Sequence, residues 1–294
     1  MKKRNITLIT AFAAAAAFAP AAQAAITATG DIGDWGKTVD GGTGNWSAIT
    51  GTGGRGAGTL DISGGNIVDA ISAGGVNIGQ QHGSAGTLTV TGPGSKYLGA
   101  TLTVGNTNGG DGTVNVTSGG SVETANFQMG SNGDSDVTVT GAGSYLSATT
   151  RLQVGRGGTP SVTLTVADGG LVQTALLQFG EGGESTLGNV HMAAGGILAV
   201  LGNKTANPFV NGGLFTFSGT PTSEIQYDAG AGFVNMNGAA ILDTDYTLTY
   251  AATGGPTVNG QDLSGYTVLT IIPEPSSMSL LALGGLALLR RRRA

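Results

Sequence analysis

The sequence predicts an all-β protein whose middle folds as a right-handed parallel β-helix (β-solenoid) of about five to six coils. Three observations predict this fold: a repeat of 25 or 26 residues, a regular alternation of apolar and polar residues within each repeat, and a high glycine content. Glycine supplies 55 of the 294 residues, without the every-third-residue period of collagen. This composition is typical of many short strands joined by glycine turns.

The repeat has two landmarks. The first is the run from Gly86 to Ser95, which recurs at 112–121, 135–144 and 162–171, with fainter copies at 58–65 and 188–197. The second is a strand-like triplet that ends in a glycine, at positions 79, 105, 130, 155 and 180. We expect the glycines between strands to adopt the positive φ values that tight corners require.

Each repeat separates an inward set of side chains from an outward set, because side chains alternate between the two faces of a strand. The inward pairs are Leu88 and Val90, Val114 and Val116, Val137 and Val139, Leu164 and Val166, and Val190 and Met192. The residues between them are Thr89, Asn115, Thr138, Thr165 and His191. In the later strand the outward residues are Thr103, Gln128, Gln153 and Gln178. Stacked coils would align the outward residues into polar ladders on the surface.

Stacking is required because a unit of this size cannot bury its own apolar face. Coils stacked about 4.8 Å apart bury that face against their neighbours. Residues 58–202 carry the repeat and are predicted to form the solenoid, and 203–272 are predicted to be a β-rich C-terminal cap. An antiparallel array of β-hairpins is the alternative architecture.

Residues 25–57 are predicted to cap the N-terminal end of the solenoid. They contain both tryptophans, Trp35 and Trp46. An aromatic lid would cover the open edge of the first coil, which would otherwise pair with another chain. The alternative is that the two rings stack on sugars.

The N-terminus has the three parts of a secretory signal peptide. A basic start, residues 2–4, precedes an apolar stretch, and Ala22-Gln23-Ala24 gives the small-x-small cleavage pattern. We expect signal peptidase to cut between Ala24 and Ala25, so that residues 1–24 are removed during export by Sec-type machinery.

The C-terminus combines Pro273-Glu274-Pro275, an apolar run at 278–289, and the four arginines Arg290, Arg291, Arg292 and Arg293. In a helix, that apolar run would reach about 18 Å, short of a hydrocarbon core of about 30 Å. The arginines would stay cytoplasmic and halt export. Residues 273–294 resemble the PEP-CTERM sorting signal. This resemblance implies an exosortase-type enzyme that recognises the motif and cleaves near it, after a transient stay in the membrane as a short transmembrane helix.

The repeats themselves, over about 58–202, are similar to the passenger repeats shared by autotransporters and PEP-CTERM proteins. Autotransporters end in a large outer-membrane barrel, whereas this sequence ends in the short sorting tail. The resemblance therefore implies an exported repeat protein at the cell surface or outside the cell, and not one that translocates itself.

The charge balance excludes a nucleic-acid partner. The span between the two signals carries six basic and 17 acidic side chains, a formal charge of −11 against −5 for the whole chain. Phosphate contacts need clustered lysines and arginines, which this span lacks. The absence of cysteine also excludes disulfides and thiolate metal sites.

No pattern in the sequence indicates catalytic, cofactor-binding or metal-binding residues. The close acidic pairs are Asp134 and Asp136, Glu181 and Glu184, and Asp243 and Asp245. They lack basic partners on the same face, and the first two pairs fall in glycine turns where solvated acids are ordinary. The two histidines, His82 and His191, lie far apart in the sequence, and no HExxH motif accompanies them.

Three functional classes follow from these observations. We expect a non-enzymatic structural protein of the cell surface or extracellular matrix, and the sorting signal implies a biofilm context with extracellular polysaccharide. The second class is an adhesin or glycan-binding protein. The third is a polysaccharide-active enzyme, because some enzymes that cleave polysaccharides are β-helices. Such an enzyme would need a pair of carboxylates.

Overall fold

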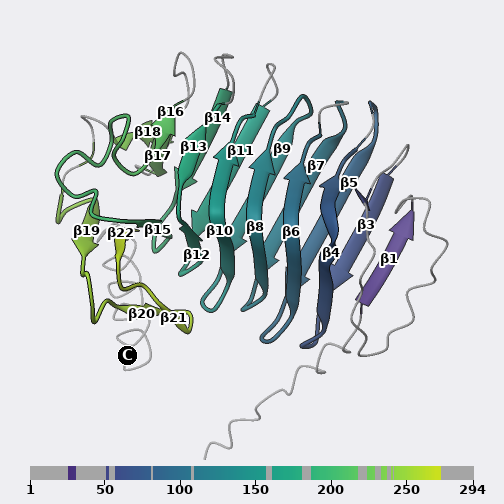
Figure 1. Ribbon diagram of the computed structural model, residues 1–294, viewed down its shortest axis with the longest axis horizontal. Coiled ribbons are helices and arrows are strands. Elements are labelled where there is room, and N and C mark those ends of the chain that lie inside the picture. Colours follow the sequence, from purple (N-terminus) through teal and green to yellow (C-terminus); the bar gives the residue numbers. More distant parts are fainter. Residues whose placement is uncertain are drawn as a thin grey trace, which may run out of the picture.

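The computed structural model describes residues 26–30, 51–52, 57–80, 82–106, 109–156, 161–180, 187–217, 224–228, 233–236, 240 and 242–272. Within them the chain is all-β, and stacked parallel coils form a β-solenoid of about five turns (Figure 1). The predicted fold class is confirmed. The antiparallel hairpin array is wrong, because neighbouring coils pair in parallel.

The coils alternate between two sheets, which form the two layers seen in Figure 1. The coil strands of the first sheet are β3 (Ala57–Ile62), β5 (Ala85–Thr91), β7 (Asp111–Thr117), β9 (Ser135–Thr140), β11 (Ser161–Ala167) and β14 (Leu187–Met192). Those of the second sheet are β2 (Gly51–Thr52), β4 (Ile67–Ile78), β6 (Lys96–Val104), β8 (Ser121–Met129), β10 (Tyr145–Val154), β12 (Leu171–Thr174), β13 (Leu177–Phe179) and β15 (Ile197–Leu201). Consecutive coils therefore lie side by side in both layers.

The core runs through the middle of the stack, between the two sheets. All ten predicted inward residues of the first sheet are 0% exposed, and the residues between them are partly exposed. The pairing is in register, with Leu88 opposite Val114 and Val114 opposite Val137. Both landmarks of the repeat thus mark equivalent positions on successive coils, and burial of the apolar columns drives their stacking.

The closing glycines form one column along the stack. Gly79, Gly105, Gly130, Gly155 and Gly180 all have φ between 65° and 78°. A Cβ at Gly79 would collide with the carbonyl oxygen of Asp111 in the next coil. Glycine is therefore required twice at this corner, for its left-handed backbone and for the close approach of the neighbouring coil.

The corner between the two sheets differs in length from coil to coil, so an alignment of the repeats without gaps is wrong by one residue there. Ser121 aligned with Ser95 in the sequence, but in the structure Ser121 pairs with Lys96. The corner before Ser121 has one residue fewer, because two successive residues, Ser118 and Gly119, have positive φ there. The two corner types absorb the difference in length and keep both sheets in register.

The second polar ladder is aligned as predicted, but the predicted exposure is wrong for three of its four members, since only Gln178 is partly exposed. Thr103 is 6% exposed, Gln128 9% and Gln153 0%. These side chains bond across coils, since Thr103 Oγ1 donates to Gln128 Oε1 at 3.4 Å and Gln153 Nε2 donates to the Gly180 carbonyl at 3.0 Å. Long amides that lie along a stack of about 4.8 Å spacing cover one another and exclude water.

Antiparallel strands pair with the outer coils at both ends of the solenoid. β1 (Ile26–Gly30) pairs antiparallel with β3 and buries Ile26. At the other end, β22 (Tyr266–Ile271) pairs antiparallel with β15, and β19 (Tyr246–Tyr250) pairs antiparallel with β22. Parallel stacking continues past residue 202, because β16 (Thr216–Phe217) pairs with β13 and β17 (Glu224–Asp228) with β14. β18 (Phe233–Asn235) then reverses direction against β17.

A small second core lies on the outer face of the second sheet. Its buried residues are Tyr145, Leu171, Ala199, Leu263 and Val268. The segment that covers it includes the hairpin of β20 (Thr257–Val258) and β21 (Gln261–Asp262). The turn of this hairpin is Asn259-Gly260 with φ of 51° and 78°, the dipeptide and backbone expected of a type I′ turn.

The Asn259 side chain attaches this hairpin to two successive coils. Its Nδ2 donates to the carbonyl oxygens of Ser144 and Gly169, both at 2.9 Å, and its Oδ1 accepts from the Gly143 amide at 3.0 Å. One amide therefore satisfies three backbone groups about a hundred residues away in the sequence, since the separations are 90, 115 and 116 residues.

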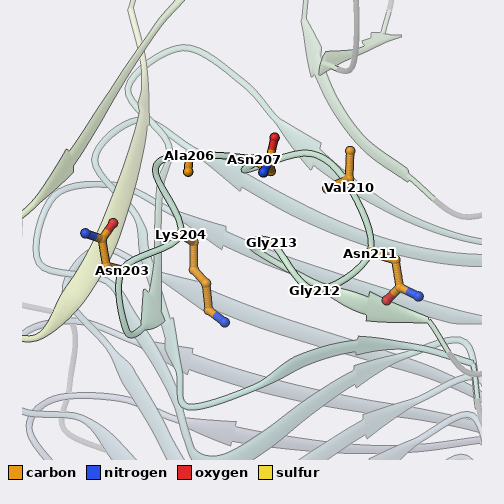
Figure 2. A pocket seen from close by; sticks show the side chains of 8 residues that line it. All are labelled: Asn203, Lys204, Ala206, Asn207, Val210, Asn211, Gly212 and Gly213. Atoms are coloured by element: carbon orange, nitrogen blue, oxygen red, sulfur yellow. The ribbon is translucent and has the colours of Figure 1, made fainter.

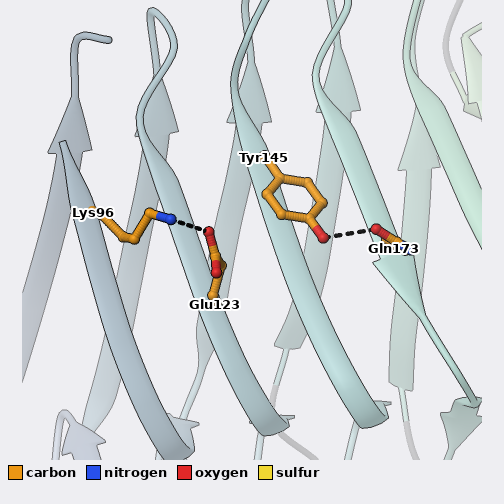
Figure 3. A network of polar contacts seen from close by, with 4 residues as sticks. All are labelled: Lys96, Glu123, Tyr145 and Gln173. Atoms are coloured by element: carbon orange, nitrogen blue, oxygen red, sulfur yellow. Dashed lines mark hydrogen bonds and ion pairs between the residues drawn. The ribbon is translucent and has the colours of Figure 1, made fainter. Parts of the chain in front are cut away.

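Two tyrosines of the second sheet differ in whether the phenol hydroxyl forms a hydrogen bond. Tyr97 points into the core, is 0% exposed, and its hydroxyl has no hydrogen-bond partner among the described residues. Burial raises the pKa of the Tyr97 phenol well above its usual range. Tyr145 lies on the outer face, where its Oη donates to Gln173 Oε1 at 2.7 Å (Figure 3). On the same sheet, an ion pair of 2.7 Å between Lys96 and Glu123 links two earlier coils.

We predict that Tyr97→Phe stabilises the protein and that Tyr145→Phe destabilises it. The first change removes a buried hydroxyl that has no partner, and the second removes a hydrogen bond, each worth about 1 kcal/mol. Thermal and urea unfolding of both variants measure the two signs. Equal shifts in the same direction would contradict this account of the two hydroxyls.

We also predict that Asn259→Gly loosens the β20–β21 hairpin. Glycine keeps the positive φ but removes all three hydrogen bonds, so amides at 257–264 should exchange with solvent faster. Asn259→Asp is the matched control, because it keeps the acceptor and loses only the two donated bonds. Its exchange rates should fall between those of the wild type and Asn259→Gly, and unchanged protection in both variants would refute the attachment.

Candidate functional site

A pocket opens in the loop 203–213, between β15 and β16 (Figure 2). Its volume is about 250 Å³. Its polar lining consists of Asn203, Lys204, Asn207 and Asn211, and the remainder of Ala206, Val210, Gly212 and Gly213. One continuous loop supplies the whole wall, so its shape depends on how that loop is held.

The loop is attached at both ends. At its start, the Lys204 amide donates to Thr267 Oγ1 at 2.8 Å, and that buried hydroxyl donates to the Gly202 carbonyl at 2.6 Å. At its end, the Leu214 amide donates to the Pro208 carbonyl at 2.8 Å, and Leu214 is buried. The pocket is therefore connected to β22 on one side and to the core on the other.

Two aromatic contacts complete the attachment. Phe215 packs edge-on against Phe179 of β13, with ring centroids 5.4 Å apart, and Phe209 packs in the same way on Tyr246 of β19. Gly213 lets the two arms of the loop approach, because a Cβ there would collide with the Asn207 carbonyl oxygen. The polar side chains thus project from a backbone that is held by packing.

The charge in the pocket comes from Lys204. Among the cations in the described residues, Lys96 pairs with Glu123, Arg151 donates to Gln178, and Arg156 donates to Gln128. Lys204 is partly buried as a residue, and its ammonium has no hydrogen-bond or ion-pair partner within the described part of the chain. The pocket therefore offers an unpaired positive charge in a protein that is acidic overall.

His191 occupies the outward column of the first sheet, as predicted, but it is not an isolated surface side chain. The Phe233 ring stacks on it with a centroid distance of 4.0 Å and an interplanar angle of 12°. Burial lowers the pKa of His191 below its ordinary value of 6.5, and a hydrogen bond with Gln226 and the charge of Asp136 oppose that shift. Packing of β18 on the sheet therefore favours the neutral imidazole.

The acidic pairs include one carboxylate that bonds the backbone of another coil, that of Asp134, and one residue that occupies a tight turn, Asp243. Asp134 Oδ1 accepts from the Ser161 amide at 2.7 Å in the next coil. Asp243 has a positive φ of 61°, and its amide donates to the Tyr246 carbonyl at 2.8 Å. Glu181 and Glu184 lie outside the described residues.

The predicted signal, sorting and stacking residues all lie outside the described residues: Ala22, Ala24 and Ala25; Trp35 and Trp46; Pro273, Glu274 and Pro275; and Arg290, Arg291, Arg292 and Arg293. The expected apolar segment 278–289 lies there too. Among the residues that were described, none belongs to a helix long and apolar enough to cross a bilayer.

The described strands nevertheless approach both predicted signals. β1 begins at Ile26, two residues after Ala24, and β22 ends at Ile271, directly before the tail. The Ile272 amide still donates to the Asp245 carbonyl at 2.9 Å. The folded solenoid thus extends to the residue that precedes Pro273.

Comparison with known proteins identifies the tail. Residues 272–293 match the family model of the PEP-CTERM protein-sorting motif. The chain ends in a PEP-CTERM motif. No curated protein and no solved structure gives a significant match to the chain.

The PEP-CTERM motif indicates sorting by an exosortase-type enzyme, and it implies export, transient membrane anchoring and then a surface location. The match agrees with the predicted tail, 273–294, to within one residue at each end. The likeness of the repeats to autotransporter passengers is not shown by these comparisons, although the β-solenoid is compatible with it.

Sequence reasoning missed the pocket in the loop 203–213. The available signal was a loss of the repeat after residue 202, combined with one lysine and three asparagines within nine residues. From that signal the sequence predicts only a cap at 203–272, because no sequence motif distinguishes a ligand-binding loop from a connecting loop.

We predict that acidification weakens the packing of β18 through His191. Because its pKa is lower in the fold than in the unfolded chain, its contribution to stability is present above pH 6.5 and is lost as the pH falls through the lowered value. His191→Thr, which restores the residue of the preceding coil, should reduce the loss of melting temperature between about pH 7.5 and pH 5. Identical pH profiles for both proteins would exclude this role.

Proposed function

We propose that this protein is an exported, non-enzymatic structural protein of the cell surface or extracellular matrix, which an exosortase-type enzyme processes at its PEP-CTERM tail. The observation that carries the proposal is the sorting motif at 272–293, which follows a solenoid without an intervening linker. Signal peptidase and Sec-type machinery would act on the other end, and the mature protein would contribute to a biofilm matrix that contains polysaccharide.

The fold supports a structural role. Its backbone hydrogen bonds run from coil to coil along the whole stack, and its core is continuous from Ile26 to Ile271. Antiparallel strands pair with the outer coil strands β3 and β15, which are therefore hydrogen-bonded on both sides. Several described carboxylates accept hydrogen bonds from backbone amides, among them Asp69, Asp134 and Asp262, which supports the non-enzymatic part of the proposal.

We predict that the motif controls processing. Wild-type protein from the surface fraction should begin at Ala25 and lack Arg290–Arg293, whereas a Pro273→Ala, Glu274→Ala double variant should keep the arginines and stay in the membrane fraction. Intact-mass and terminal-peptide mass spectrometry of fractionated cells measure both ends. Ser276→Ala, which leaves the Pro273-Glu274-Pro275 triplet intact, is the matched control and should be processed normally.

Two outcomes would refute the proposal. An intact arginine tail on wild-type surface protein would exclude processing, and normal processing of the double variant would exclude recognition of the motif.

A further inference from the structure

We propose that the pocket in the loop 203–213 binds a carboxylate-bearing sugar unit of an acidic polysaccharide, with the Lys204 ammonium pairing with the carboxylate. This inference rests on the proposed surface function in one respect, since that function brings the pocket into contact with polysaccharide. The chemistry of the site is argued from the residues that line it.

The charge selects an anionic group. Lys204 is a partly buried residue at the wall of a cavity of about 250 Å³, and its ammonium has no protein partner among the described residues. A lysine in such a position gains a charge-assisted hydrogen bond when a carboxylate enters. The acidic character of the rest of the chain opposes this only weakly, because charges more than about 8 Å apart are screened at physiological salt.

The amides favour a sugar over a simple anion. Asn203, Asn207 and Asn211 line the pocket together with Lys204 (Figure 2). Each asparagine side chain can both donate and accept hydrogen bonds, whereas acetate only accepts and phosphate near neutral pH offers at most one or two hydroxyl donors. Sugar hydroxyls do both, so a uronic acid could use the amides and the ammonium together.

The apolar part of the wall suits the remaining surface of a sugar ring. Val210 is 47% exposed and lines the pocket, and Ala206 lies on the same wall. The C–H face of a pyranose can cover this apolar surface while its hydroxyls reach the amides. The volume is below the range of about 300–1,000 Å³ that is usual for larger ligands, which indicates one sugar unit of a chain rather than a long segment.

The pocket is held in place before any ligand binds. The Lys204 backbone is fixed by its 2.8 Å hydrogen bond to Thr267, and the far arm of the loop is fixed by the buried Leu214. A site whose backbone is already ordered loses less conformational entropy on binding. This attachment distinguishes the loop from an ordinary exposed connection.

The test measures binding of defined oligosaccharides to the full chain, purified in detergent. Oligogalacturonate and oligoglucuronate are the acidic probes, with the corresponding neutral galactose and glucose oligomers as controls. We expect both acidic probes or one of them to bind, with an affinity that falls as salt rises, and the neutral oligomers to bind at least about tenfold more weakly. Isothermal titration calorimetry gives the affinities, and amide chemical shifts of residues 203–213 locate the site.

Matched variants test whether the positive charge of Lys204 is responsible for binding. Lys204→Gln should weaken binding of the acidic probe by about tenfold or more, the loss of one charge-assisted hydrogen bond. Lys96→Gln removes the same charge at a distance from the pocket and should leave the affinity unchanged. Asn211→Ala should weaken both acidic and neutral oligomers, and thermal melting confirms that each variant is folded.

Three outcomes would overturn the proposal. These are no binding of either acidic probe up to about 10 mM, equal affinity in Lys204→Gln, or inorganic phosphate and acetate binding as tightly as the acidic oligomers. The last outcome would identify a plain anion site. Because processing is read by mass spectrometry in cells and binding by calorimetry, failure of this proposal and failure of the proposed function give different results.

Discussion

In-register hydrogen bonding between successive coils is the constraint on which the rest of the structure depends. A single repeat exposes its apolar face, so each coil is stable only against neighbours whose inward residues occupy the same columns. Leu88, Val114 and Val137 form one such column. A shift of one residue in any coil would turn its inward set outward. The two corner types and the closing glycines are local solutions that preserve this register.

The same constraint explains why the ends differ from the middle. Parallel stacking leaves an unpaired strand edge at each end, and reversed strands cover the outer coils here. The C-terminal reversal places β22 between β15 and β19, where it is paired on both sides. The chain therefore enters its sorting tail directly from a strand that is fixed in the sheet, and removal of that tail would leave β22 in place.

Much of the fold could be predicted because a repeat shows the same physical requirement several times. The alternation of Leu88, Thr89 and Val90 recurs in each unit, so the inward and outward sets were assigned correctly. Features that occur once gave no such signal. The burial of Gln153 depends on amides in adjacent coils, and the bonds of Asn259 join residues about a hundred positions apart. The pocket is also a feature that occurs once, since only the folded loop shows that Lys204 lines a cavity with three asparagines.

The pocket and the sorting tail are connected through one strand. Thr267 of β22 holds the Lys204 backbone, and Ile272 lies five positions further along the chain. On the proposed anchoring, residues 273–277 alone separate the solenoid from the membrane segment, and they can span at most about 18 Å. The pocket would then lie on the part of the solenoid nearest the membrane while the tail is attached. Cleavage would free it to meet polysaccharide away from the membrane, without any change in the strand that holds it.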